Sequence, residues 1–192
     1  MNLQALPEDA LKEILALTQA KKKLDLREQA QDKFMPFAHH VYENFIEGSH
    51  HRVIAKKLEE VASGKIKRLI INMPPRHSKS EFASYLMPAW FLGRNPKLKI
   101  IQATHNTELA VRFGRKVRDL IDDPQYKDIF PTTNLKEDNK GAGRWQTDKG
   151  GEYFAAGVGA AVTGRGADLF VIDDPHSEQD ALSESAFDHA YE

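Results

Sequence analysis

The residues best suited to chemistry lie in the stretch RLIINMPPRHSKSE at 68–81. It opens with a short apolar run at 69–71, which has the length and β-branched content of a buried strand. Met73 is followed by two prolines, which forbid helix and force an irregular turn. Lys79 and Ser80 then begin an amphipathic run. This order is typical of a phosphate-binding loop, in which backbone N–H groups face an anion, the lysine reaches the outer phosphates and the hydroxyl ligates magnesium.

A second stretch, LFVIDD at 169–174, supplies the acidic residues that such a site needs. ATPases with a phosphate-binding loop hold magnesium and polarise the attacking water with polar groups at the end of an apolar strand. Asp173 and Asp174 are therefore candidates for these two roles. Met73 and Ser78 replace the glycines of the usual loop pattern. The loop pattern therefore predicts a nucleotide-binding site mainly when it is taken together with the acidic strand.

The composition is that of an ordinary globular domain. The chain has 192 residues, of which 41% are apolar and 29% charged, and this is enough for one core. No apolar run approaches the length of a membrane-spanning helix, and the acidic N-terminal segment does not resemble a signal peptide. The absence of cysteine excludes disulfides and cysteine-ligated zinc.

Charge is unevenly distributed along the chain. The net charge of −1 gives no global basic field that would attract nucleic acid. Basic residues nevertheless cluster at 21–23, at 56–68 and at 112–118, whereas 168–192 contains acids and neither lysine nor arginine. The basic clusters could contact a phosphate backbone or could be solvated helix faces, and the sequence leaves both readings open.

The hydrophobic pattern predicts an α/β domain with a mainly parallel sheet flanked by helices. Helices are expected at 7–30, 50–62 and 107–121, from Ser80 with a kink or end near Met87, and from Ser177 onward. Strands are expected at 65–73, 98–103 and 169–172, with a β-hairpin at 144–155. Val53, Ile54, Leu58 and Val61 are expected to face inward from the helix at 50–62. Aromatic residues at 34–45 could pack in the core or cover an adenine ring.

Three segments together resemble the ATPase domain of the large terminase subunit, the DNA-packaging motor of tailed bacteriophages. They are NMPPRHSKSE at 72–81, ATHNTELAVRFGRKVRD at 103–119 and RWQTDKGGEYFAAGVGAAVTGRGADLFVIDDP at 144–175. The similarity extends from about residue 34 to residue 192. It implies a P-loop NTPase fold that hydrolyses ATP with Mg²⁺ as cofactor.

The resemblance also implies a role for individual loop residues. Lys79 is similar to the lysine that contacts the β- and γ-phosphates, and Ser80 to the residue whose hydroxyl ligates magnesium. Arg76 matches the arginine that this family places within its phosphate loop, and Asp173 matches the magnesium carboxylate. The nucleotide-binding loop is then formed by Pro75, Arg76, His77, Ser78, Lys79, Ser80 and Glu81.

Two further positions carry catalytic roles by resemblance. Asp174 stands where the family usually has a glutamate that orients the attacking water. Aspartate withdraws the carboxylate by one methylene, and misplacement by about 1 Å can cost on the order of a hundredfold in rate. Arg165 is similar to the arginine that is offered to the ATP of a neighbouring subunit. If Arg165 acts in this way, the isolated chain is expected to be a poor ATPase.

The family's organisation implies a helical segment on the adenine side at 1–48 and an ATPase core at 49–192, which ends before the coupling motif and nuclease domain. Its implied partners are double-stranded DNA, other copies of the chain in a ring, the portal and the small terminase subunit, in the host cell cytoplasm and without a membrane. Two other functions remain open. Asp-Asp-Pro-His at 173–176 is similar to the Asp-Glu-x-His box of helicase-like ATPases, and a non-hydrolysing nucleotide- or DNA-binding module is also compatible with Ser78 and Asp174.

Overall fold

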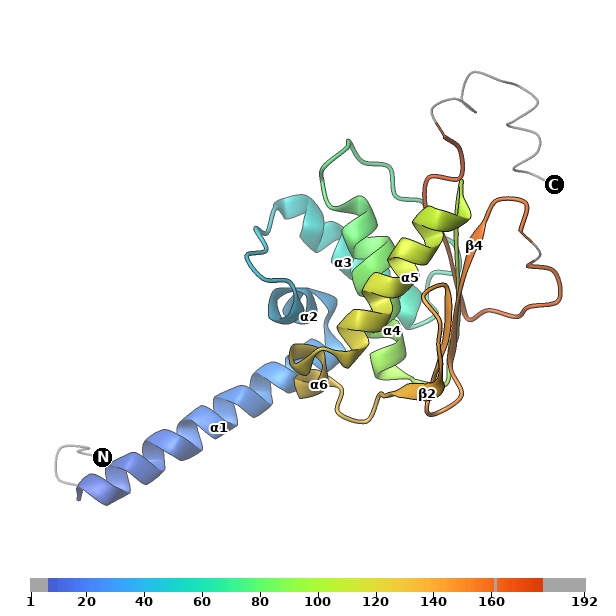
Figure 1. The fold of residues 1–192 in the computed structure, drawn as a ribbon. Helices are drawn as coiled ribbons and strands as arrows, with labels where there is room; N and C mark the ends of the chain where they lie inside the picture. Colours follow the sequence, from blue (N-terminus) through green and yellow to red (C-terminus); the bar gives the residue numbers. More distant parts are fainter. Residues whose placement is uncertain (1–6, 161, 178–192) are drawn as a thin grey trace.

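The protein has an α/β fold in which a five-stranded sheet is packed against helices. The computed structural model describes residues 7–160 and 162–177, and Figure 1 shows the helices gathered on one side of the sheet. The helices, in chain order, are α1 (Glu8–Asp32), α2 (Phe34–Val41), α3 (Ser49–Ala62), the π-helical η2 (Glu81–Leu86), α4 (Met87–Arg94), α5 (Thr107–Asp122) and α6 (Pro124–Ile129). The strands are β1 (Lys99–Thr104), β2 (Leu135–Lys140), β3 (Arg144–Thr147), β4 (Glu152–Gly157) and β5 (Leu169–Ile172).

The sheet is mixed, which corrects the expectation of a mainly parallel sheet. Its strand order is β2-β3-β4-β1-β5. Strand β1 pairs in parallel with both β4 and β5, whereas β3 pairs antiparallel with β2 and β4. The predicted hairpin accounts for the antiparallel pair of β3 and β4, because its tight turn, with Gly150 at a φ of +92°, can only join antiparallel neighbours.

A core of aromatic and aliphatic side chains joins the helices to the sheet. Trp90 is fully buried, packs edge-on against Phe34 at 5.5 Å between ring centroids, and donates its indole N–H to the Ala30 carbonyl. Near the sheet, Tyr153 stacks on Trp145 at 4.9 Å. The aromatic residues Phe34 and Phe37 of α2 are therefore core residues. They do not line a base-binding surface.

The strand expected at 65–73 is not formed. Leu69, Ile71 and Met73 pack partly against the core, while Ile70 is 85% exposed, so the segment keeps the alternation of a strand. Within the described chain it pairs with none of the five strands of the sheet. A strand needs a hydrogen-bonding neighbour, and the local pattern of apolar residues cannot reveal whether one is present.

Helix α1 has the predicted position but few contacts with the body of the protein. Figure 1 shows its N-terminal part projecting away from the remaining helices. Among its residues only Ala30, near the C-terminal end, is buried. None of the described helices is long and apolar enough to cross a membrane.

Smaller differences concern single faces and short elements. Helix α3 turns Ile54 and Leu58 inward as predicted, but Val53 is 64% exposed because it lies on the opposite face of the helix. Strand β2 and helix α6 were not predicted. The last expected helix, from Ser177, lies almost wholly outside the described residues.

Candidate functional site

The loop before Lys79 adopts the backbone conformation for which the usual phosphate-loop pattern uses glycine. Ser78 has a φ of +64° and Arg76 a φ of +62°. This left-handed region costs a non-glycine residue about 1–2 kcal/mol. The Ser78 carbonyl accepts a hydrogen bond from the N–H of Phe82 at 3.0 Å, and His77 bonds to the Pro75 carbonyl at 2.8 Å through Nδ1. The side chain of serine does not prevent the loop from taking the glycine-like turn.

The helix that follows the loop carries a polar group into the core. Its first part, η2, is π-helical, and π-turns occur frequently at functional sites. Ser84 in this turn is fully buried. Its hydroxyl donates a hydrogen bond to Asp173 Oδ2 at 2.8 Å. Pro88 lies in the first turn of α4, so it neither ends nor breaks the helix that continues to Arg94.

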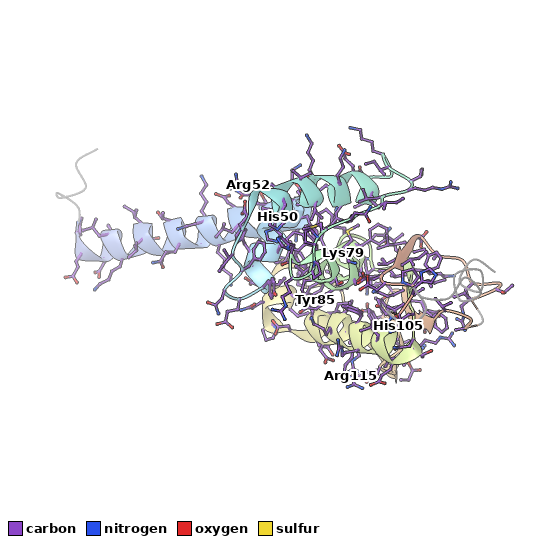
Figure 2. All side chains as sticks on the ribbon, turned by 90° about the horizontal axis from the view of Figure 1, so that it is seen from above. His50, Arg52, Lys79, Tyr85, His105 and Arg115 are labelled. Atoms are coloured by element: carbon purple, nitrogen blue, oxygen red, sulfur yellow. The ribbon has the colours of Figure 1, made fainter. Side chains whose placement is uncertain are left out.

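Lys79 contacts both of the aspartates that were predicted to share its site. Its Nζ lies 2.7 Å from Asp174 Oδ1 and 3.4 Å from Asp173 Oδ1. The hydrogen bond to Asp174, followed by the charge of Asp173, raises the pKa of Lys79 above its ordinary value despite partial burial. The lysine is therefore a permanent cation at this site. In Figure 2, Lys79 lies near the middle of the body, between helices α3 and α5.

The sheet explains why the two carboxylates reach the phosphate loop. Strand β5 ends at Ile172 beside β1, and the N–H of Asp173 donates to the Ala103 carbonyl at 3.0 Å. Both strands thus end at the same edge, where parallel α/β sheets commonly bind ligands. Asp173 is buried, with 7% of its surface exposed, whereas the Asp174 side chain is 59% exposed. One carboxylate is fixed and the other can reach solvent.

The donor set suits magnesium better than a transition metal. The oxygens of Asp173, Asp174 and Ser80 are hard ligands, and Mg²⁺ is usually held by one or two carboxylates together with water and substrate phosphates. Within the described residues no group of three or more histidine, cysteine or acidic side chains could hold a metal by itself. A magnesium-binding role for Asp173 and Ser80 therefore stays a prediction.

Glu81, the last predicted loop residue, is engaged with α5. Its carboxylate lies 2.8 Å from the Lys116 amine, and that amine also stands over the Tyr85 ring at 4.4 Å from the centroid. Burial, with a smaller contribution from Glu81, raises the pKa of Tyr85 to about 12. Tyr85 is therefore neutral at physiological pH and cannot serve as a base. Of the other predicted loop residues, Pro75, Arg76 and His77 are exposed.

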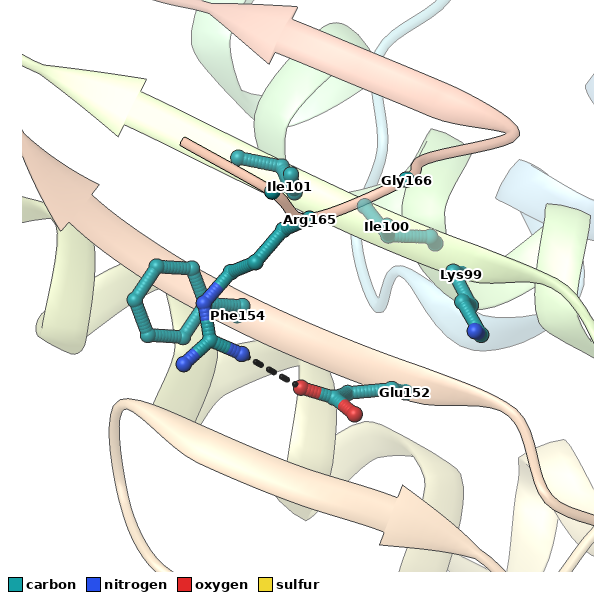
Figure 3. A pocket seen from close by; sticks show the side chains of 8 residues that line it. Lys99, Ile100, Ile101, Glu152, Phe154, Arg165 and Gly166 are labelled. Carbon is teal, nitrogen blue, oxygen red and sulfur yellow. Dashed lines mark hydrogen bonds and ion pairs between the residues drawn. The ribbon is translucent and has the colours of Figure 1, made fainter. Parts of the chain in front are cut away.

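Arg165 is not part of the group around Lys79. Figure 3 shows its guanidinium lying over the Phe154 ring, at 4.1 Å from the centroid, and paired with Glu152 at 3.2 Å. These residues border a cavity of about 210 Å³ together with Lys99, the first residue of β1. Because β1 rises by about 3.3 Å per residue, Lys99 is roughly 16 Å from the end of the strand where Asp173 lies. Arg165 thus lies toward the other end of the parallel strands.

Two residues that were not predicted from the sequence lie beside the site. His105 follows β1 directly, and both its N–H and its Nδ1 approach the Asp174 carbonyl, at 3.0 and 3.2 Å. Asn106 caps α5 by accepting a hydrogen bond from the N–H of Leu109 at 2.8 Å. Both residues border a second cavity of about 280 Å³. Their position, polar residues at the carboxyl end of a parallel strand, is the signal that could have identified them.

A histidine cluster lies behind the phosphate loop. The rings of His50 and His51 are 3.9 Å apart, and His77 of the loop is 5.7 Å from His50. His51 is buried, stacks on Phe82 and accepts a hydrogen bond from the N–H of Gly48 at Nδ1. Its burial, followed by the neighbouring charge of His50, lowers the pKa of His51.

No protein-family model matches the sequence, and no curated protein matches it. The case for a function therefore depends on the geometry of the site.

Proposed function

We propose that the chain is a P-loop ATPase and the motor domain of a phage terminase large subunit, which hydrolyses ATP to move double-stranded DNA into a procapsid. The observation that carries this proposal is the contact of Lys79 with Asp173 and Asp174 at the carboxyl edge of the parallel strands. In the sequence these groups are more than ninety residues apart. Their convergence next to a glycine-like loop supports a single triphosphate site.

Hydrolysis would proceed by in-line attack of water on the γ-phosphorus. As the new P–O bond forms, the bond to the bridging oxygen breaks, and ADP and phosphate are released. Catalysis of this kind depends on positioning and charge stabilisation. Lys79 would neutralise charge on the outer phosphates, and Asp174, the exposed carboxylate, would orient the water. Bound Mg²⁺, held by Ser80 and Asp173, would neutralise the charge that develops on the phosphate oxygens.

In the proposed motor the chain would work with other copies in a ring, with the portal and with the small terminase subunit, in the host cytoplasm. DNA contacts would go mainly to the phosphate backbone, as in other binding without sequence preference. Arg165 would act on the ATP of a neighbouring copy, because in its own chain it is engaged by Glu152 and Phe154 and is not part of the group around Lys79.

Lys79→Ala tests the proposal directly. Removing a charge-stabilising donor typically costs about 10²–10³ in kcat, so we expect the variant to lose at least a hundredfold in ATP turnover, measured as phosphate release at high protein concentration. Lys97→Ala is the matched control, because Lys97 is exposed and lies at the far end of β1. Equal ATP turnover in wild type and Lys79→Ala would show that the proposed ATPase function is wrong. ATP binding without turnover in wild type would favour the non-hydrolysing module.

A further inference from the structure

The backbone of Asp174 is held in an unfavourable conformation by one neighbour. Asp174 has a φ of +47°, in the left-handed region that costs a non-glycine residue about 1–2 kcal/mol. Its carbonyl accepts two contacts from His105, one from the backbone N–H at 3.0 Å and one from Nδ1 at 3.2 Å. The direction of the Asp174 carboxylate depends on this backbone conformation, and the carboxylate accepts a hydrogen bond from Lys79.

The hydrogen-bond network fixes the tautomer of His105. Asn106 Oδ1 accepts from the N–H of Leu109, so Nδ2 is the amide atom that faces His105. This Nδ2 lies 2.8 Å from His105 Nε2, which must therefore be the accepting nitrogen. In the neutral ring the proton is then on Nδ1, which donates it to the Asp174 carbonyl. A continuous chain of hydrogen bonds leads from the first turn of α5 through Asn106 and His105 to Asp174.

We propose that His105 is a positioning residue of this site, which holds Asp174 in the orientation needed to align the attacking water. The proposal rests on the proposed ATPase function. His105 would act through Asp174 and would not contact the reacting atoms. Loss of the Nδ1 donor would let the Asp174 backbone relax and move its carboxylate. Since a displacement of about 1 Å can cost on the order of a hundredfold in rate, the effect should appear in kcat.

Two substitutions separate positioning from a general effect on folding. In His105→Asn the amide nitrogen can occupy the place of Nδ1 and donate to Asp174. In His105→Gln the amide lies closer to the place of Nε2, so it can reach Asn106 but not the Asp174 carbonyl. We expect His105→Gln and His105→Ala to lose about ten- to a hundredfold in kcat, with KM for ATP within a few fold of wild type, whereas His105→Asn keeps most of the activity. Melting temperatures are measured for all three variants.

The outcomes distinguish this proposal from the proposed function. If Lys79→Ala is inactive while His105→Gln and His105→Ala turn over like wild type, His105 has no positioning role and the ATPase assignment stands. If kcat falls as far in His105→Asn as in His105→Ala, the proposal that Nδ1 of His105 positions Asp174 is wrong. The same holds if the variants raise KM for ATP and leave kcat unchanged. If turnover does not depend on Lys79, both the ATPase function and the role of His105 are wrong.

Discussion

At the scale of single residues, the phosphate loop shows how a non-glycine residue is accommodated at a position that prefers glycine. Ser78 has a left-handed backbone conformation, which is unfavourable for serine. Its carbonyl nevertheless accepts a hydrogen bond from the N–H of Phe82, at the start of the helix in which Ser84 contacts Asp173. The free-energy cost of this conformation can be removed by substituting Ser78, because its side chain has no role in the contacts of the Lys79 amine.

Substitution of Ser78 by glycine should therefore stabilise the protein. Relief of about 1–2 kcal/mol of left-handed strain is offset by roughly 0.5–1 kcal/mol of extra backbone entropy in the unfolded state, so we expect a gain of about 0.5 kcal/mol in the free energy of unfolding. The free energy of unfolding of both proteins is measured by chemical denaturation. Ser63→Gly is the control, because Ser63 has a φ of −81° and should lose stability. A loss of stability in Ser78→Gly would show that the turn is not strained.

His51 should make folding stability depend on pH. Burial lowers its pKa in the folded state below the ordinary value of about 6.5, so the unfolded chain binds more protons in this range. Stability is therefore fully present above pH 6.5 and decreases as the pH falls toward the folded pKa. Three charged or titratable groups act on His51, namely His50, Glu47 and His77.

The test is the free energy of unfolding at pH 7.5 and pH 5.5. In His51→Asn the amide oxygen can still accept the N–H of Gly48, but the titrating group is gone, so we expect a smaller difference between the two pH values. Val53→Ala, on the exposed face of the same helix, removes no titrating group and should keep the wild-type difference. If the free energy of unfolding changes by the same amount between the two pH values in wild type and in His51→Asn, His51 is not the cause of the pH dependence.

At the scale of elements, the exposed leucines of α1 and the buried leucine of α4 should differ sharply in their contribution to stability. Leu15 is 58% exposed on the projecting part of α1, whereas Leu92 is fully buried against the core. We expect Leu15→Ala to change the free energy of unfolding by less than about 0.5 kcal/mol and Leu92→Ala to cost about 2–5 kcal/mol. Thermal denaturation of both variants checks this. A large loss in Leu15→Ala would mean that α1 packs against a partner.

The elements that sequence could predict are those whose signal is local. Helix α5 has an apolar stripe, and the hairpin of β3 and β4 has a glycine turn, so both were predicted close to their bounds. The segment at 65–73 has an equally clear alternation but no partner strand in the described chain. Strand β2, with charged residues at most positions, has no apolar pattern and becomes a strand only because β3 lies beside it.

The candidate site was predictable to a similar degree. Lys79, Asp173 and Asp174 could be brought together from the sequence by their motifs, although the strand that was expected to lead into the loop is not formed. The contacts of His105 with Asp174 and of Ser84 with Asp173 could not be predicted, because they are hydrogen bonds between distant segments. Likewise, Glu152 and Phe154 as the neighbours of Arg165 follow from the register of β4 and not from the Gly-Arg-Gly segment itself.

At the scale of the whole molecule, the two ends of the parallel strands carry different chemistry. The carboxyl end holds Lys79 and the aspartates, and the other end holds Arg165, where Glu152 and Phe154 keep it in place. In its own chain the Arg165 guanidinium is engaged by Glu152 and Phe154, which are in register with Lys99 and Ile101 of β1, so it must leave these partners to reach the Lys79 site. We therefore propose that any catalytic contribution from Arg165 is made to the site of a second copy.

The expected consequence is an ATPase activity that rises with protein concentration. An arginine supplied in trans is worth about 10³–10⁵ in rate, so turnover per chain should increase steeply as copies associate, and Arg165→Ala should abolish this increase while keeping the low activity of the dilute protein. Arg144→Ala is the matched control, because Arg144 pairs with the same Glu152 carboxylate at 3.1 Å. It should keep the concentration dependence. If Arg165→Ala and wild type have the same turnover at every concentration, Arg165 is a structural residue of the sheet, held by Glu152 and Phe154.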